Sequence, residues 1–200
     1  MNAFCRINKK VYEYISRRKL RNKKFTIISN NCWAGFVYRS LKLEYKTPFV
    51  GLFLYSPDYI KLLENLHYYL GCDLKFVRES KYDRVDNKQY PIGILDDIEI
   101  HFLHYKTEAE AYQKWMKRLK RVDYDNLFIK YSDRDLFTEE HLQRFENLAF
   151  ENKVFFTARK YDHFDSTVHF SMFNNCESVD KEWDYYFKYF DIARWLNNRN

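Results

Sequence analysis

The sequence predicts a single three-layer, Rossmann-like α/β domain, with helices on both faces of a largely parallel or mixed sheet. Apolar runs typical of buried strands alternate with amphipathic helical segments through most of the chain, and 200 residues suit one domain. Because 46% of the residues are hydrophobic, disordered and collagen-like proteins are excluded. No apolar run approaches the roughly 18–20 residues that cross a bilayer.

Positive charge is concentrated at the N-terminus. Residues 1–24 hold nine of the 34 Lys and Arg residues and one of the 28 acids, which leaves 25 bases and 27 acids elsewhere. Apolar side chains recur there at spacings of three and four, at Phe4, Ile7, Val11 and Ile15. This spacing predicts an amphipathic helix over about residues 3–20. Two interpretations stay open: the helix lies on an anionic membrane leaflet, or it packs on its own domain or on a second subunit.

Charge and cysteine content also limit the function. A nucleic-acid enzyme usually spreads Lys and Arg over a folded face, so charge confined to one arm predicts no nucleic-acid partner. The four cysteines form no CxxC pair and no zinc spacing, and the N-terminal charges precede no apolar stretch of a secretory signal. We therefore expect reduced thiols and a cytoplasmic protein.

The other elements follow from apolar runs and helix caps. Strands are expected at residues 25–28, 74–77, 91–95, 98–105, 126–131 and 153–158. Helices are expected from Trp33 to Leu41, from Ser56 to Leu70, after Thr107, after Thr138, and at the C-terminus through Trp183, Phe187, Phe190 and Trp195. The segment 159–180 is expected to be irregular.

The predicted elements divide the chain into three parts. Residues 1–23 form the basic amphipathic helix, and residues 24–162 form the α/β core. Residues 163–200 form an irregular segment and an aromatic C-terminal helix that packs on the core.

Polar residues follow three predicted strands where each strand ends: 29–32, 132–135 and 157–160. In parallel sheets these exits share one edge, and ligands bind beyond the carboxyl ends of the strands. We therefore expect Asn31, Asp133 and Arg159 to be neighbours around a shared hollow. The candidate substrate-binding residues, which would hold an anionic group, are Ser29, Asn30, Asn31, Arg134, Arg159 and Lys160. No glycine-rich loop follows the first strand, which excludes a P-loop or dinucleotide fingerprint.

Catalytic candidates lie at or near these exits. Asp133 and Asp135 form an Asp-x-Asp pair that can share a divalent cation holding a diphosphate, or can be neutralised by Arg134 or Arg159 in a structural network. Cys32, at a helix N-terminus, is either a nucleophile with a lowered thiol pKa or a buried structural cysteine. His104 is either a general base or a structural histidine. Asp133 is a third catalytic candidate, and the divalent cation is the one cofactor considered.

Eight short segments carry a family resemblance: Ser29–Gly35, Thr47–Phe53, Asp58–Leu66, Tyr90–Gly93, Asp97–Tyr105, Asp125–Phe128, Ser132–Leu136 and Asn152–Thr157. They cover roughly residues 24–162, so the N-terminal arm and the tail lie outside them. The chain resembles an uncharacterised bacterial family, catalogued as a domain of unknown function. Its members are often labelled exopolysaccharide or capsule biosynthesis proteins, and sometimes transferases. The resemblance implies a cytoplasmic role in making surface glycans and transfers no catalytic residue.

Together these observations predict a glycosyl or acyl transferase of bacterial exopolysaccharide or capsule biosynthesis. It would bind an anionic activated donor at the carboxyl edge of the sheet, with a small-molecule or lipid-linked sugar as substrate. In the acyl version Cys32 takes the acyl group and His104 activates it. Peripheral contact with the inner membrane leaflet is expected, and the sequence assigns no oligomeric state. The alternative is a non-catalytic adaptor that docks to membrane or to a protein partner through the basic N-terminal helix.

Overall fold

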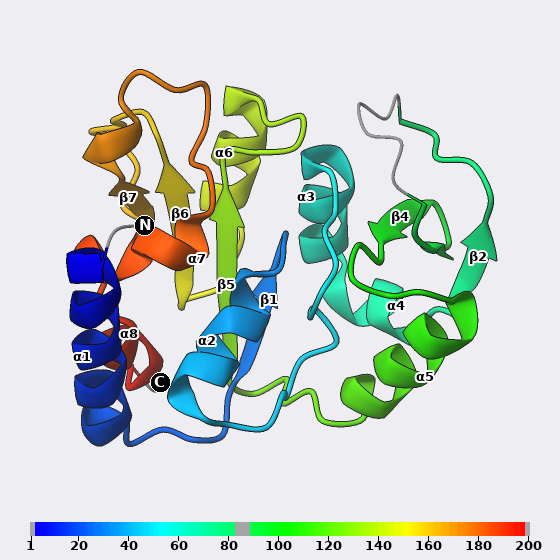
Figure 1. Ribbon diagram of the computed structural model, residues 1–200. Coiled ribbons are helices and arrows are strands. Elements are labelled where there is room, and N and C mark those ends of the chain that lie inside the picture. The colour runs from blue at the N-terminus through cyan, green and yellow to red at the C-terminus, as the bar shows by residue number, and fades with distance from the viewer. Residues whose placement is uncertain (1–2, 83–88, 199–200) are drawn as a thin grey trace.

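A parallel four-stranded sheet forms the centre of the protein. The computed structural model describes residues 3–82 and 89–198, with side chains from residue 5 onward. The strands lie in the order β1 (Thr26–Ser29), β5 (Leu127–Ser132), β6 (Lys153–Thr157) and β7 (Thr167–His169), and every neighbouring pair is parallel. Their carboxyl ends therefore meet at one edge, the upper edge in Figure 1. The α/β class predicted from the sequence is confirmed.

A second, antiparallel sheet contains β2 (Lys75–Val77), β3 (Ile92–Leu95) and β4 (Ile98–His101). These strands were predicted, but they form a separate sheet instead of extending the parallel one. Two residues, Asp96 and Asp97, connect β3 to β4, and a parallel pair would need a crossover of a dozen or more residues. Asp96 takes the left-handed conformation (φ 54°) that tight hairpin turns require.

Helices cover both faces of the parallel sheet, because alternate strand side chains point to opposite sides. Ile27, Phe128 and Phe156 belong to one hydrophobic cluster, to which α1 (Ala3–Lys19), α2 (Trp33–Leu41), α7 (Glu182–Tyr185) and α8 (Ile192–Leu196) contribute. The neighbouring strand residues Ile28, Ile129 and Phe155 belong to the other cluster. That cluster includes α3 (Ser56–Glu64), α4 (Leu66–Gly71), α5 (Glu108–Leu119) and α6 (Glu139–Glu146).

The C-terminal part differs most from the prediction. The segment expected to be irregular contains β7 and a 3-10 turn at Ser171–Phe173, so the parallel sheet continues past residue 162. The expected single C-terminal helix is wrong, because α7 and a 3-10 turn (Tyr186–Lys188) are separated from α8. A new helix begins where the Asp191 side chain accepts the N–H of Arg194 (3.0 Å).

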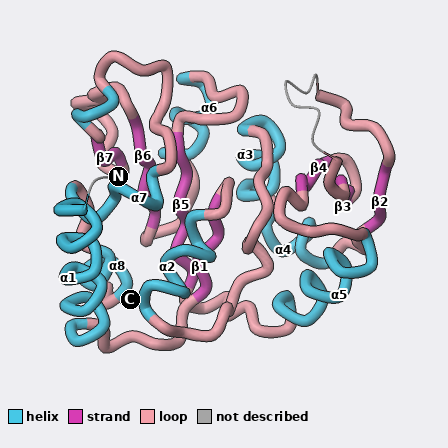
Figure 2. The backbone as a smooth tube through the Cα atoms, viewed as in Figure 1, coloured by secondary structure: helices cyan, strands magenta, loops and turns pink. Residues whose placement is uncertain are grey.

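The N-terminal helix α1 follows the prediction closely and lies along one side of the molecule, against α2 and α8 (Figure 2). The predicted helix from Ser56 is interrupted at Asn65, whose ψ of 49° is not helical. Within the described ranges, none of the helices has the length and apolar character needed to cross a bilayer.

Gly93 in β3 supplies a test of core packing. A Cβ at this position would lie 2.7 Å from Leu74 Cδ1 and 2.7 Å from Phe102 Cε2, closer than atoms can approach. We predict that Gly93→Ala lowers the free energy of unfolding by about 1–3 kcal/mol in urea denaturation. The matched control is Gly71→Ala, because a Cβ there meets nothing within 4 Å and stability should stay unchanged or rise slightly. Equal losses in both variants would contradict this account.

Candidate functional site at the carboxyl edge of the parallel sheet

The residues that follow β1 form a buried, hydrogen-bonded turn that leads into α2. The Ser29 hydroxyl donates to the carbonyl of Asn31 (2.6 Å) and accepts the N–H of Ala34 (3.3 Å). The Asn31 side-chain oxygen accepts the N–H of Trp33 (3.1 Å). Ser29, Asn30 and Asn31 are all buried, so these side chains build the turn and are not open to a ligand.

A buried ion pair lies beneath this turn. Lys130 of β5 and Glu182 of α7 are both fully buried, and Lys130 Nζ lies 2.5 Å from Glu182 Oε1. Asn31 Nδ2 donates to the same carboxylate oxygen at 2.6 Å. Lys130 Nζ also donates to Ser132 Oγ (3.1 Å) and Asn30 Oδ1 (3.3 Å). We call these five residues the Lys130–Glu182 cluster; it connects β1, β5 and α7.

The cluster favours the ionised form of Glu182. Burial alone raises the pKa of this carboxyl, but the positive charges of Lys130 and Arg134 outweigh burial and hold its pKa below the ordinary value. The Arg134 guanidinium lies 3.7 Å from Glu182 Oε2. The ring of Phe156 lies 5.4 Å from Lys130 Nζ and adds a cation–π contact. Neither member of this pair is among the site residues predicted from the sequence. Lys130 could have been noticed because it is a lysine inside the apolar strand LFIKYS. Nothing in the local sequence around Glu182 indicates that this residue is buried.

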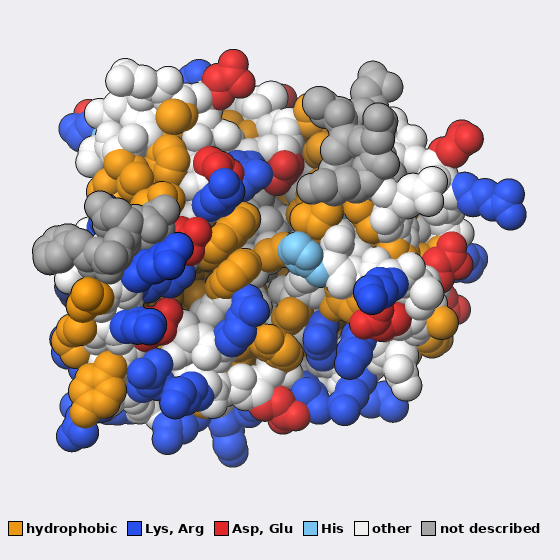
Figure 3. All heavy atoms as spheres, viewed as in Figure 1, with side chains coloured by type: hydrophobic (Ala, Val, Ile, Leu, Met, Phe, Trp, Pro, Cys, Tyr) orange, Lys and Arg blue, Asp and Glu red, His pale blue; other side chains and the backbone are white. Residues whose placement is uncertain are grey.

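An open hollow of about 380 Å³ lies next to the cluster, where β5 and β6 end. Of the three expected neighbours, Asp133 and Arg159 line it and Asn31 does not. Charged and polar side chains make up most of the wall, which consists of Asp133, Arg134, Asp135, Leu136, Phe137, Thr138, Glu139, Arg159, Glu177 and Ser178. Figure 3 shows the molecule from the same side as Figure 1, with hydrophobic side chains gathered in the middle of the view and charged side chains of both signs beside them.

Asp133 acts as a structural clamp in this wall. Its two carboxylate oxygens accept the backbone N–H groups of Ala158 (2.6 Å) and Val179 (2.9 Å). Burial raises its pKa, although these two bonds act in the opposite direction. In the described part of the chain no three His, Cys, Asp or Glu residues are grouped so as to hold a metal ion. A cation here would therefore need ligands from a bound substrate.

Asp135 is the titratable group of the hollow that is poised near neutral pH. Burial raises its pKa to about 6, with Arg134 opposing the shift and Glu182 adding to it. Its backbone is left-handed (φ 57°), and its carbonyl accepts the N–H of Ser56 (2.8 Å), so the turn after β5 is fixed against α3. A half-buried carboxyl that titrates near pH 6 has the properties of a general base.

The remaining catalytic candidates lie elsewhere. Cys32 is 7% exposed, its thiol donates to the carbonyl of Leu52 (3.6 Å), and burial together with Glu182 raises its pKa to about 11. The lowered pKa that the nucleophile hypothesis required is therefore not found. His104 is exposed in the turn after β4, which ends at His101 and not at the predicted Tyr105. It does not line the hollow.

The two basic residues after β6, both predicted to bind an anion, lie in different surroundings. Arg159 is exposed and lines the hollow. Lys160 does not line it, because its ammonium pairs with Asp162 at 2.5 Å on the surface. Arg159 therefore remains a candidate anion-binding residue, and Lys160 serves as its natural comparison.

A second buried acidic cluster lies near the antiparallel sheet. Asp58 accepts the N–H of Glu99 (2.7 Å) and pairs with Lys81 (2.8 Å). Glu99 accepts the N–H of Lys81 (2.6 Å) and the hydroxyl of Ser80 (2.7 Å), and His101 Nε2 lies 3.3 Å from its carboxylate. These contacts fix the segment before residue 82 to α3 and β4, which is a structural role.

Comparisons with known proteins cover nearly the whole chain. A family model described as "Domain of unknown function (DUF1919)" matches residues 3–197, which includes α1 and the C-terminal segment as well as the core. A protein of Haemophilus influenzae (strain ATCC 51907 / DSM 11121 / KW20 / Rd), described as an uncharacterized protein, is 38% identical over 212 residues. The match covers 99% of this chain and 100% of that protein. Neither description names an activity.

The buried pair can be tested with a double-mutant cycle. We predict that Lys130→Met and Glu182→Gln each lower the free energy of unfolding by about 3–5 kcal/mol, because each leaves the other charge buried without its partner. The double variant should lose less than the sum of the two single variants, measured by chemical denaturation at neutral pH. Strictly additive losses would contradict a direct interaction between the two side chains.

The raised pKa of Asp135 predicts a pH-dependent gain in stability on neutralising it. The pKa of Asp135 is about 6 in the folded state, against an ordinary value of 3.8, so folding favours the protonated carboxyl. The stability of the wild-type protein therefore falls as the pH rises from about 4 to about 6. Asp135→Asn keeps the shape and tolerates the left-handed backbone. Its stability advantage should be absent below about pH 4, grow through about pH 6 and stay constant above. Parallel pH profiles of the two proteins would refute the shift.

Proposed function

We propose that this chain, which belongs to the family described as a domain of unknown function (DUF1919), is a glycosyl or acyl transferase of bacterial exopolysaccharide or capsule biosynthesis. The observation that supports this proposal is the hollow at the carboxyl edge, where two guanidinium groups and a carboxyl with a pKa of about 6 face the same space. Guanidinium groups suit the phosphates of an activated donor, because they bind oxyanions with two parallel hydrogen bonds.

The charge balance of the hollow constrains the donor. Arg134 and Arg159 are accompanied by four acids, Asp133, Asp135, Glu139 and Glu177. A diphosphate donor would therefore enter as a complex with a divalent cation, which offsets the excess negative charge. Mg²⁺ commonly binds in this way, through one or two carboxylates and the phosphates of the substrate.

Asp135 is the group we assign as general base, in place of His104. Its carboxyl is largely ionised at neutral pH and is basic enough to accept a proton from an acceptor hydroxyl. The buried Cys32 thiol argues against the acyl-enzyme route, because a pKa of about 11 leaves almost no thiolate at neutral pH. Direct glycosyl transfer is therefore the favoured chemistry, in the cytoplasm, from a nucleotide-activated or lipid-linked sugar.

Binding of nucleoside-diphosphate sugars tests the proposal. We predict that Arg159→Ala weakens donor binding by about 10- to 100-fold in titration calorimetry with Mg²⁺ or Mn²⁺ present, because one charge-assisted contact is lost. Lys160→Ala is the matched control: it removes a neighbouring exposed cation that pairs with Asp162, and affinity should stay unchanged.

Two results would overturn the proposal. One is the absence of heat from every sugar nucleotide, with and without divalent cation. The other is an equal loss of affinity in the Arg159 and Lys160 variants, which would place the anion outside the hollow.

A further inference from the structure

Helix α1 is attached to the domain by its less apolar face. The Tyr12 hydroxyl donates to the carbonyl of Phe190 (2.7 Å) and accepts the N–H of Ile192 (2.8 Å). Lys9 pairs with Asp184 of α7 at 3.0 Å, and Cys5 and Ser16 are buried on the same side of the helix. These positions recur at spacings of four, three and four, so they form one continuous stripe that is already occupied by contacts within the chain.

The opposite face of α1 carries apolar side chains that no element of the described part of the chain covers. Ile7, Val11, Tyr14 and Ile15 are 60%, 51%, 54% and 43% exposed. We call these four residues the outer stripe. The sequence predicted three of them as a stripe together with Phe4, whose side chain lies outside the described part of the chain. Such a row of large exposed apolar side chains on a helix marks an interaction surface.

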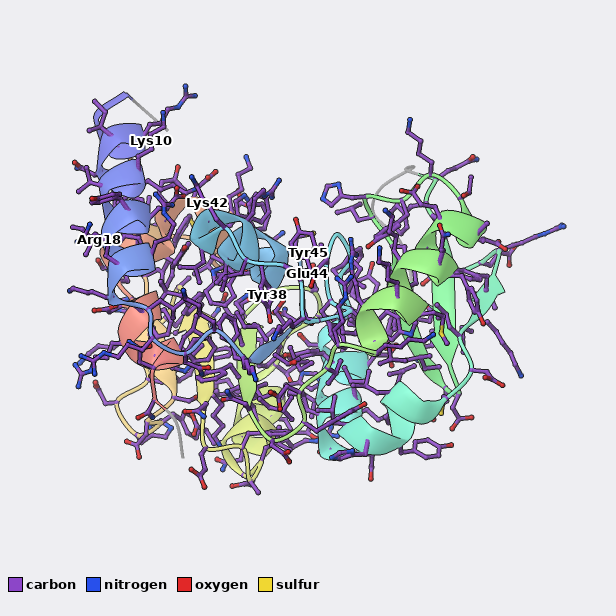
Figure 4. All side chains as sticks on the ribbon, turned by 90° about the horizontal axis from the view of Figure 1, so that it is seen from below. Lys10, Arg18, Tyr38, Lys42, Glu44 and Tyr45 are labelled. Carbon is purple, nitrogen blue, oxygen red and sulfur yellow. The ribbon has the colours of Figure 1, made fainter. Side chains whose placement is uncertain are left out.

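Cations border the outer stripe. Arg6, Lys10, Arg18 and Lys19 are exposed on the same helix, and Arg21, Lys23 and Lys24 are exposed just after it. Among the described side chains of α1, the one acid, Glu13, is half-buried. Figure 3 shows hydrophobic and basic side chains interleaved over α1 at the left edge of the molecule, and Figure 4 shows Lys10 and Arg18 on this helix.

We propose that α1 docks the protein on the surface of an anionic bilayer. A helix that lies in the membrane interface inserts its apolar face about 5–10 Å into the headgroup boundary, while flanking Lys and Arg side chains reach back to the phosphates. Each basic residue near an anionic leaflet strengthens binding, and here the positive charge and the exposed apolar side chains share one helix.

The shape of this surface favours a bilayer over a protein partner. Helix α1, which carries the outer stripe, lies at the margin of the molecule (Figure 2). From Ile7 to Ile15 it extends about 12 Å, which is little more than one heptad and too short for a stable coiled-coil seam with a second copy. A planar anionic surface can contact an exposed stripe of this length at the margin of the molecule, and it complements the positive charge beside the stripe.

Vesicle flotation of the full-length protein tests this proposal. We expect the protein to float with vesicles of phosphatidylcholine and phosphatidylglycerol, to bind pure phosphatidylcholine vesicles at least about tenfold more weakly, and to be released as ionic strength rises. Because the assay measures lipid binding alone, its result does not depend on the transferase proposal.

Two variant pairs separate the apolar and electrostatic contributions. Ile7→Ser with Val11→Ser should weaken binding to the anionic vesicles about tenfold or more, whereas Tyr112→Ser, which removes an exposed apolar side chain on α5, should not. Lys10→Gln with Arg18→Gln should also weaken it about tenfold or more, whereas Lys114→Gln with Lys117→Gln removes the same charge from α5 without effect. All these side chains are exposed, so thermal unfolding should confirm an intact fold.

Three outcomes would overturn the proposal. They are equal binding to neutral and anionic vesicles, unchanged binding when the outer stripe is made polar, and a wild-type dimer in size-exclusion chromatography that the Ile7 and Val11 substitutions convert to monomer. The last result would identify a second copy of this chain as the occupant of the stripe.

Discussion

The buried pair between Lys130 and Glu182 is the interaction on which the architecture depends. It joins the centre of the parallel sheet to α7, a helix of only four residues. Because neither charge is exposed, the C-terminal segment cannot leave the sheet without separating Lys130 from the carboxylate that neutralises it. Through Asn31 the same pair fixes the turn between β1 and α2. One electrostatic contact thus holds together segments from both ends of the chain.

This arrangement determines where a ligand can bind. All parallel strands deliver polar residues to one edge, but α7 covers the exit of β1 and converts its polar side chains into structural ones. The exits of β5 and β6 remain open, because Asp133 holds the chain before α7 to one side through the N–H of Val179. The edge is consequently divided into a closed, charge-neutral cluster and an open hollow that Asp135 and Arg159 line.

The sequence predicts the parts of this design that local physics controls. Apolar runs located β1, β5 and β6, and Thr107 capped α5 as expected by accepting the N–H of Glu110 (3.2 Å). It could not predict β7, which has three half-buried residues and no periodicity to detect. Nor could it assign Lys130, because the carboxylate that compensates its charge lies 52 positions away. The sequence placed polar residues after three strands. It could not show which of them close the turn after β1 and which line the hollow, because that depends on the position of α7.

The orientation of α1 could likewise not be predicted from its sequence. This helix also connects the N-terminal and C-terminal parts of the chain. Its sequence contains two stripes, and the more apolar one would ordinarily be buried. The domain instead binds the other, because Tyr12 and Lys9 find partners in the chain around Phe190 and in Asp184. Since α7 supplies both Asp184 to α1 and Glu182 to Lys130, one short helix couples the exposed basic helix to the sheet. A bilayer bound by α1 would therefore be held in a fixed orientation relative to the hollow.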